Sequence, residues 1–277
     1  MEKQSLILLA EIAKITTSPF NGFDDGLYAV KNLAKSNCKA LYPETNPVVE
    51  LLDGFDSLQT EFVIKEYSAF SYAAIHMLLD AALRNHDWKL LQNEIIRNIN
   101  EEKGEETKDI PHLEMMRQGY KNDLGIETDN YNASGITMSF LDKMKRIFKE
   151  VDNAFVAGAL MAFEGSAIPE FVILDKIVTA YRHKKNLPAI SKRDLTQLYI
   201  DGHKDFEIGH EQGLIDAVKP FINSKNTGNM IKGYVSVCIA LSTWWEQLAV
   251  EAVYVGVATK TQLNTREDFD VTGAFLN

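Results

Sequence analysis

The sequence predicts an all-α protein built as a single domain. Apolar residues recur at helical spacing over long segments, and no confident alternating strand and no repeat of about 20–50 residues is found. The 277 residues suffice to bury a substantial core in one large domain or two small ones. With only 16 Gly and 7 Pro, breaks between the apolar segments are sparse, which favours one domain.

The first half of the chain is expected to form helices separated by short polar breaks. Residues 5–15 and 26–34 are short helix candidates, and the place of residues 1–58 within the domain stays open. A long amphipathic helix is predicted over residues 58–84. Asp87 fits the N-cap of the next helix, which would run from residue 88 to about residue 102.

The second half continues the helical pattern. A helix is expected to begin near Asp109, because Pro111 suits a first helical turn, and residues 124–136 predict a loop rich in Gly, Asn, Asp and Thr. Residues 259–277 are polar and predict a loosely packed tail, so the helical domain would span residues 1–258. Further helices are expected over residues 141–163, 173–182, 192–222 and 230–258.

The charge balance excludes several classes of partner. The chain carries 29 Lys and Arg against 39 Asp and Glu, a formal net charge of −10. Sequence-independent nucleic-acid binding and docking on anionic lipid both need clustered cations, so we expect neither. The longest apolar stretch, residues 233–245, has 13 residues, fewer than the roughly 20 that span a bilayer. We expect no membrane span and no signal peptide.

Two cysteines, Cys38 and Cys238, occur without CxxC or zinc-type spacing. This usage indicates a reduced, cytoplasmic protein.

The richest chemical pattern is a pair of histidines with a carboxylate between them. His203, Glu207 and His210 occupy positions i, i+4 and i+7, which lie along one stripe of an α-helix. Imidazole and carboxylate together suit iron or manganese, and zinc is also compatible. The alternative interpretation is a solvated helix face that carries two histidines.

Two further features add ligand-type residues. Glu164 follows a strongly apolar run, where a carboxylate is costly unless it is paired, protonated or bound to a metal. Its alternative is a solvent-exposed Glu at a helix end, before Gly165. Glu102 would close one helix and His112 would begin the next, so they can face each other across a short connection; the alternative is an exposed acidic turn.

Together these residues supply three carboxylates and three imidazoles from four helical segments. That inventory matches a dinuclear iron or manganese site in a helix bundle. Ferritin-like bundles use two Glu-x-x-His pairs, and Glu207 with His210 forms one of them. The second candidate pair, Asp109 with His112, contains Pro111, so the ferritin pattern fits poorly.

At these residues, and over roughly residues 60–255, the chain resembles the heme-oxygenase-like dimetal oxidases, most closely their CADD-like branch. The superfamily signature is an Asn-x-x-acid-Glu-x-Gly segment, a His, a later Glu and His-x-x-x-(Asp/Glu)-x-x-His. This chain departs from the signature at two points. Glu207 stands where Asp is commoner, and the interval of ten residues from Glu102 to His112 is longer than in the shortest members of the family. The matching positions are Asn98, Glu101, Glu102, Gly104, His112, Glu164, His203, Glu207 and His210.

The resemblance implies an up-and-down bundle of about seven helices, commonly a homodimer. It implies a dioxygen-activating non-heme oxidase of a small molecule, amino-acid-like or a fatty acid, in specialised metabolism. Two iron ions, or manganese in their place, would be cofactors, dioxygen a co-substrate, and an unidentified electron donor a partner. The implied metal ligands are Glu102, His112, Glu164, His203, Glu207 and His210.

Glu66 and His76, on the helix predicted over residues 58–84, are candidates for an extra ligand or a substrate contact, although a core or surface role is the simpler interpretation. Two other functions stay open. One is a metal-free hydrolase or oxidase like the TenA-type thiaminases on the same fold, and the other is a non-catalytic CADD-like interaction protein.

Overall fold

The computed structural model describes residues 13–15, 20, 22–105, 110–191 and 193–273, with backbone alone for residues 206–208 and from residue 258 onward. The described part of the chain is all-α and contains no strand, as predicted. Besides helical residues 13–15, it holds nine α-helices, more than the about seven expected for such a bundle. They are α2 Phe23–Asn37, α3 Pro47–Leu51, α4 Ser57–Arg84, α5 Lys89–Glu102, α6 His112–Gly119, α7 Gly135–Phe148, α8 Asn153–Lys184, α9 Leu195–Val218 and α10 Thr227–Gly273.

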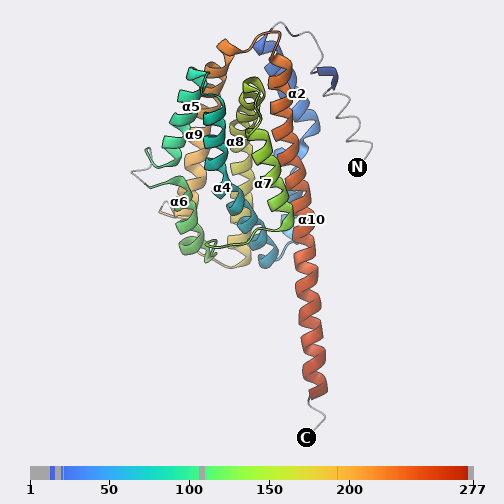
Figure 1. Cartoon of the computed structure of the whole chain (residues 1–277). Helices are drawn as coiled ribbons and strands as arrows, with labels where there is room; N and C mark the ends of the chain where they lie inside the picture. The colour runs from blue at the N-terminus through green and yellow to red at the C-terminus, as the bar shows by residue number, and fades with distance from the viewer. Residues whose placement is uncertain (1–12, 16–19, 21, 106–109, 192, 274–277) are drawn as a thin grey trace.

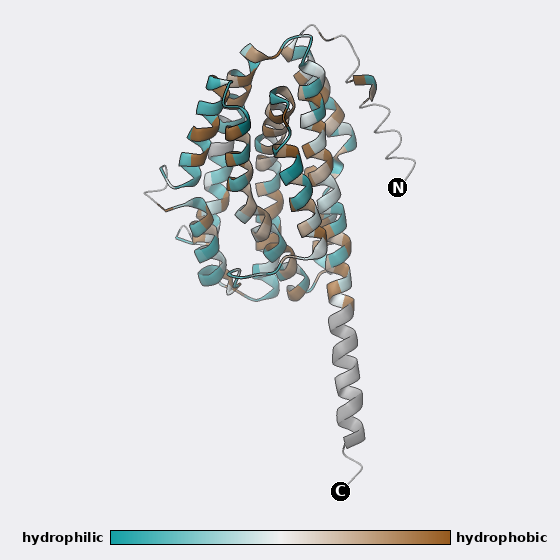
Figure 2. Ribbon diagram, in the orientation of Figure 1, coloured by the Kyte–Doolittle hydropathy of each residue, from teal (hydrophilic) through white to brown (hydrophobic). Residues whose placement is uncertain are grey.

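The helices form one bundle in which α8 is central (Figure 1). This helix packs against α4, α9 and α10, while α5 and α6 pack on α9. Apolar and polar residues are interspersed along the helices of the bundle, as Figure 2 shows. One contiguous core of buried apolar side chains joins the helices from α2 to α10. The helices therefore bury their apolar faces against one another, as the amphipathic pattern of the sequence predicts.

Helix α8 differs from the prediction at its start and in its middle. The sequence suggested one helix over residues 141–163 and another over residues 173–182, but the first is broken at residues 149–152. Asp152 is the N-cap of α8, and its side chain accepts a hydrogen bond of 2.8 Å from the Phe155 backbone N–H. The helix then passes through Pro169 without ending. By length and composition α8 could cross a membrane, but 67% of its most apolar window is buried inside the bundle.

Helix α10 crosses α8 at very close range. A Cβ atom added to Gly158 would lie 1.9 Å from the Met230 carbonyl oxygen, and one added to Gly233 would lie 1.8 Å from the Phe155 carbonyl oxygen. Only glycine therefore fits at either position, since real Cβ contacts are never so short. The close crossing fixes α8 against α10 and so holds the site-bearing face of α8 toward α9.

The structure corrects one local expectation and refines others. The side chain of Asp87 does not cap α5, whose N-cap is Trp88 without a side-chain hydrogen bond. In the segment predicted as a loosely packed tail after residue 258, α10 continues to Gly273 and extends beyond the bundle (Figure 1). The helix expected over residues 26–34 is confirmed as α2, whereas the one over residues 5–15 lies almost wholly outside the described residues.

Candidate metal centre

Four helices bring the predicted ligand residues together inside the bundle. Glu102 is the last residue of α5, and the chain turns away through Gly104, whose φ of 108° favours glycine. His112 begins α6 directly after Pro111. Glu164 lies in the middle of α8, which removes the alternative of a solvent-exposed helix end. His203 lies on α9.

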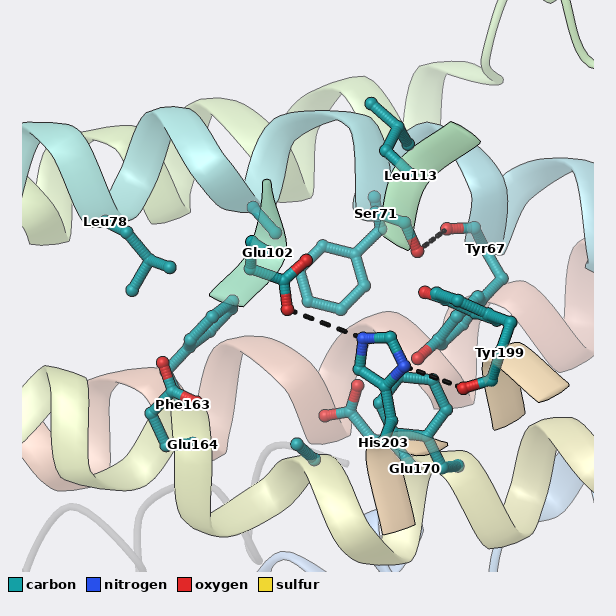
Figure 3. Close-up of a pocket in the computed structure, with 14 residues that line it drawn as sticks. Tyr67, Ser71, Leu78, Glu102, Leu113, Phe163, Glu164, Glu170, Tyr199 and His203 are labelled. Carbon is teal, nitrogen blue, oxygen red and sulfur yellow. Dashed lines mark hydrogen bonds and ion pairs between the residues drawn. The ribbon is translucent and has the colours of Figure 1, made fainter. Parts of the chain in front are cut away.

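The best-defined group consists of Glu102, His112 and His203. Their ligand atoms all lie within 4.8 Å of one another, so the group could hold a metal ion. Glu102 Oε1 lies 3.3 Å from His112 Nδ1 and 3.4 Å from His203 Nε2. Both histidines are buried, with 2% and 5% of their surface exposed. Figure 3 shows Glu102 and His203 facing each other across the pocket.

A backbone hydrogen bond sets the orientation of His203. Its Nδ1 lies 2.7 Å from the Tyr199 carbonyl oxygen, one turn earlier in α9. A carbonyl only accepts, so Nδ1 donates this hydrogen bond, and Nε2 is the ring nitrogen that faces Glu102. Phe171 stacks on the same ring, with centroids 4.3 Å apart. Metal-binding histidines typically have such a partner for their second ring nitrogen.

The charge of Glu102 is stabilised by the same histidines. Burial opposes ionisation of this carboxyl, but hydrogen bonds from His112 and His203 outweigh it and hold the pKa of Glu102 well below its usual range. The side chain keeps 25% of its surface exposed. An ionised carboxylate flanked by imidazoles is a suitable donor set for iron or manganese.

A second group lies alongside the first and contains a residue that the sequence analysis did not select. His210 Nε2 contacts a carboxylate oxygen of Glu101, and His210 Nδ1 lies 3.6 Å from Glu164 Oε2. Arg97 contacts the other oxygen of Glu101. Glu101 was quoted only as part of the Asn-x-x-acid-Glu-x-Gly segment, because spacing along α5 does not tell which of two adjacent carboxylates turns toward which histidine.

The remaining candidates are placed differently. Glu207 lies on α9 between His203 and His210, but its side chain lies outside the described residues. Glu66 is buried away from the group and accepts hydrogen bonds from Tyr131 and from the backbone and hydroxyl of Ser134. His76 is exposed on another face of α4, beside α7. The structure therefore does not bring Glu66 or His76 to the centre.

A cavity of about 80 Å³ opens beside the first group. Glu102, Glu164 and His203 form part of its wall, and Figure 3 shows a further carboxyl group, Glu170, near His203. Sequence reasoning missed Glu170, although its place six residues after Glu164 near the centre of an apolar helix was a signal for burial. The apolar part of the wall comes from Phe70, Ala74, Leu78, Leu113, Phe163, Ala167 and Phe171.

The fold and the group define the class of protein: an all-α bundle with a buried Glu and His cluster that could hold a metal ion. A family model described as a domain of unknown function with solved structure, DUF3865, matches residues 27–251. The chain therefore belongs to the DUF3865 family.

Two crystal structures of a protein from Nostoc punctiforme PCC 73102, described as CADD-like and of unknown function, have the same fold. The structure at 2.00 Å resolution matches with a TM-score of 0.76 and 27% identity, covering 83% of this chain and 97% of the other. The structure at 1.35 Å gives a TM-score of 0.75 and 26% identity over 83% and 95% of the two chains. The CADD-like resemblance is confirmed. No curated protein matches this chain.

Proposed function

We propose that this protein is a dioxygen-activating non-heme diiron oxidase of a small molecule. The observation that carries the proposal is the convergence of Glu102, His112 and His203 from three helices onto one buried point. Burying ionisable groups costs free energy unless they are paired or bind a metal. A cluster of imidazoles and carboxylates is a donor set that suits a transition metal. The donor set therefore fits the iron that the CADD-like resemblance implies.

The side chains divide into two candidate metal positions. Glu102, His112 and His203 would hold the first ion, and Glu164 and His210 would hold the second, with Glu207 as its further ligand by sequence. Glu101 and Arg97 lie behind His210 and keep its ring oriented. Bound iron would supply the redox chemistry with dioxygen that none of these side chains offers by itself.

The protein's own contribution is positioning and exclusion of water. Tyr199 and Phe171 fix the ring of His203, and the apolar wall of the cavity keeps the substrate side of the centre dry. Reduction of dioxygen needs an external electron donor, which we expect as a partner. A homodimer and a cytoplasmic location also stay predictions.

The metal-free hydrolase is less well supported, because it needs a nucleophile. Burial, aided by the charge of Glu246, raises the pKa of Cys38 to about 12, and burial together with Cys38 and Glu170 raises that of Cys238 well above its usual value. Thiolates are therefore scarce at neutral pH. An interaction protein would leave the burial of His112, His203 and His210 without a reason.

The test is the optical response of the iron-loaded protein to oxygen. Wild-type protein is loaded with Fe(II) without oxygen, desalted, and mixed with oxygenated buffer while absorbance is followed. We expect an oxygen-dependent absorbance change that His112→Ala abolishes. His183→Ala removes a histidine that lines a different pocket and should leave the change intact. An identical trace in wild type and His112→Ala would contradict the proposal.

A further inference from the structure

The cavity beside the candidate metal centre contains a carboxyl group that the proposed ligand set does not use. Glu170 lies on α8, six residues after Glu164, and only 3% of its surface is exposed. Its Oε1 is buried and has no hydrogen-bond partner among the described residues. Figure 3 shows this carboxyl among the side chains that line the cavity. A buried polar atom without a partner is rare and costs free energy, so it calls for a reason.

The other residues of the cavity wall determine which kind of ligand Glu170 could bind. None of the described residues that line the cavity is Lys or Arg, whereas three of them are Glu. Two of these, Glu102 and Glu164, face histidines. Glu170 is therefore the carboxyl of the wall that has an oxygen available for a bound molecule.

The environment holds Glu170 as a neutral acid while the cavity contains no ligand. Burial raises its pKa to about 8, and a hydrogen bond with Ser166 only partly opposes this. A cationic group entering the cavity would supply the countercharge that the wall lacks. A carboxylate entering the metal-free cavity would find no Lys or Arg among the described wall residues to pair with, and burying an unpaired charge is strongly unfavourable.

We propose that Glu170 binds the amino group of the substrate, so that this cavity selects small apolar amines over carboxylates of the same length. The inference rests on the proposed function and narrows its substrate class, because it disfavours fatty acids. The amine would meet Glu170, and the carbon chain would lie against the apolar wall formed in part by Phe70, Leu78 and Phe163. The wall and the carboxyl together would place the chain beside Glu102 and His203.

The first test compares three ligands of equal length on the full-length protein. Dissociation constants for n-butylamine, butan-1-ol and butanoate are measured by calorimetry, with the protein both stripped of metal by a chelator and loaded with Fe(II) without oxygen. We expect the amine to bind at least about tenfold more tightly than butanoate in the metal-free protein, where no bound iron can coordinate the carboxylate. Equal binding of butanoate, or no amine binding at millimolar concentration, would overturn the inference.

The second test uses Glu170→Gln, which keeps the shape of the side chain and removes its ability to ionise. We expect n-butylamine binding to weaken at least about tenfold, while butan-1-ol binding changes little. Glu251→Gln is the matched control, because Glu251 binds Ser134 and is not among the residues that line the cavity. Unchanged amine binding in Glu170→Gln would overturn the inference. The ligand preference of wild type is a readout that does not depend on the folding of the variant.

Different experimental results would overturn the diiron-oxidase proposal and the amine-binding proposal. A protein that takes up no iron but shows amine binding dependent on Glu170 would overturn the diiron oxidase and leave the amine site standing. A protein that takes up iron but shows no preference for the amine would overturn the amine site alone. Because the binding assay is also run without metal, the metal-free comparison excludes coordination of either the amine or butanoate by iron.

Discussion

Glu101 and His210 lie 109 positions apart in the chain, yet the Glu101 carboxylate contacts Nε2 of the His210 ring. The same carboxylate contacts Arg97, one turn earlier on α5. The pair joins α5 to α9. While Nε2 contacts Glu101, the other ring nitrogen, Nδ1, faces Glu164.

This arrangement predicts that Glu101 positions His210 for the second ion. Glu101→Gln should lower iron affinity at that position about 10–100-fold, the usual effect of losing a carboxylate behind a metal-binding histidine. The measurement is an anaerobic Fe(II) titration. The matched control is Glu94→Gln, since Glu94 also contacts Arg97 on α5 but no histidine. Equal titrations for Glu101→Gln and wild type would show that Glu101 does not act on the centre.

Glu170 predicts a pH dependence of stability in the metal-free protein. The ordinary pKa of Glu is 4.5, and in the folded protein that of Glu170 is about 8. Between these values the folded state binds a proton that the unfolded state lacks, so stability falls as pH rises. The slope is about 1.4 kcal/mol per pH unit at most.

Glu170→Gln removes this contribution, so the variant should gain stability relative to wild type as pH rises through this window. Urea unfolding between about pH 5 and about pH 8 measures the effect. Curves of stability against pH that run parallel for the two proteins would contradict the protonated state of Glu170. Glu251→Gln serves as the control, since Glu251 does not line the cavity.

The glycines at the crossing of α8 and α10 predict a packing effect. Gly158→Ala should destabilise the fold by about 1–3 kcal/mol or more, because its Cβ would overlap the Met230 carbonyl. Gly209, on α9, has no atom within 4 Å of an added Cβ. Gly209→Ala should therefore stabilise the protein by up to about 1 kcal/mol. Urea unfolding measures both, and equal stabilities would refute the close crossing.

Much of the fold could be predicted from the sequence, because long amphipathic segments such as α4 carry the 3.6-residue period themselves. The boundaries of the central helix α8 were harder to predict. This helix is apolar on nearly all sides, so periodicity gives no boundary, and Pro169 suggests an end that tertiary burial overrides. Its start at Asp152 had a local signal, the capping carboxylate, which was overlooked because one continuous helix was predicted over residues 141–163.

The candidate site was predictable where one helix carries several ligands. His203 and His210 lie two turns apart, so the helical period alone places both on one face of α9. Glu101 and Glu102 are neighbours, and only the packing of α5 against α6 and α9 separates their roles. Glu170 belongs to no sequence motif. Its proposed role depends on the absence of Lys and Arg from the described cavity wall, which only the folded structure shows.

The most direct test of the account is the iron content of the protein after anaerobic Fe(II) loading and desalting. Wild type should retain about two irons per chain, and His203→Ala and His210→Ala should each retain about one, since each loses a ligand of a different ion. His183→Ala, at a separate pocket, should retain the wild-type content. Less than about 0.2 iron per chain in wild type would contradict a dimetal centre.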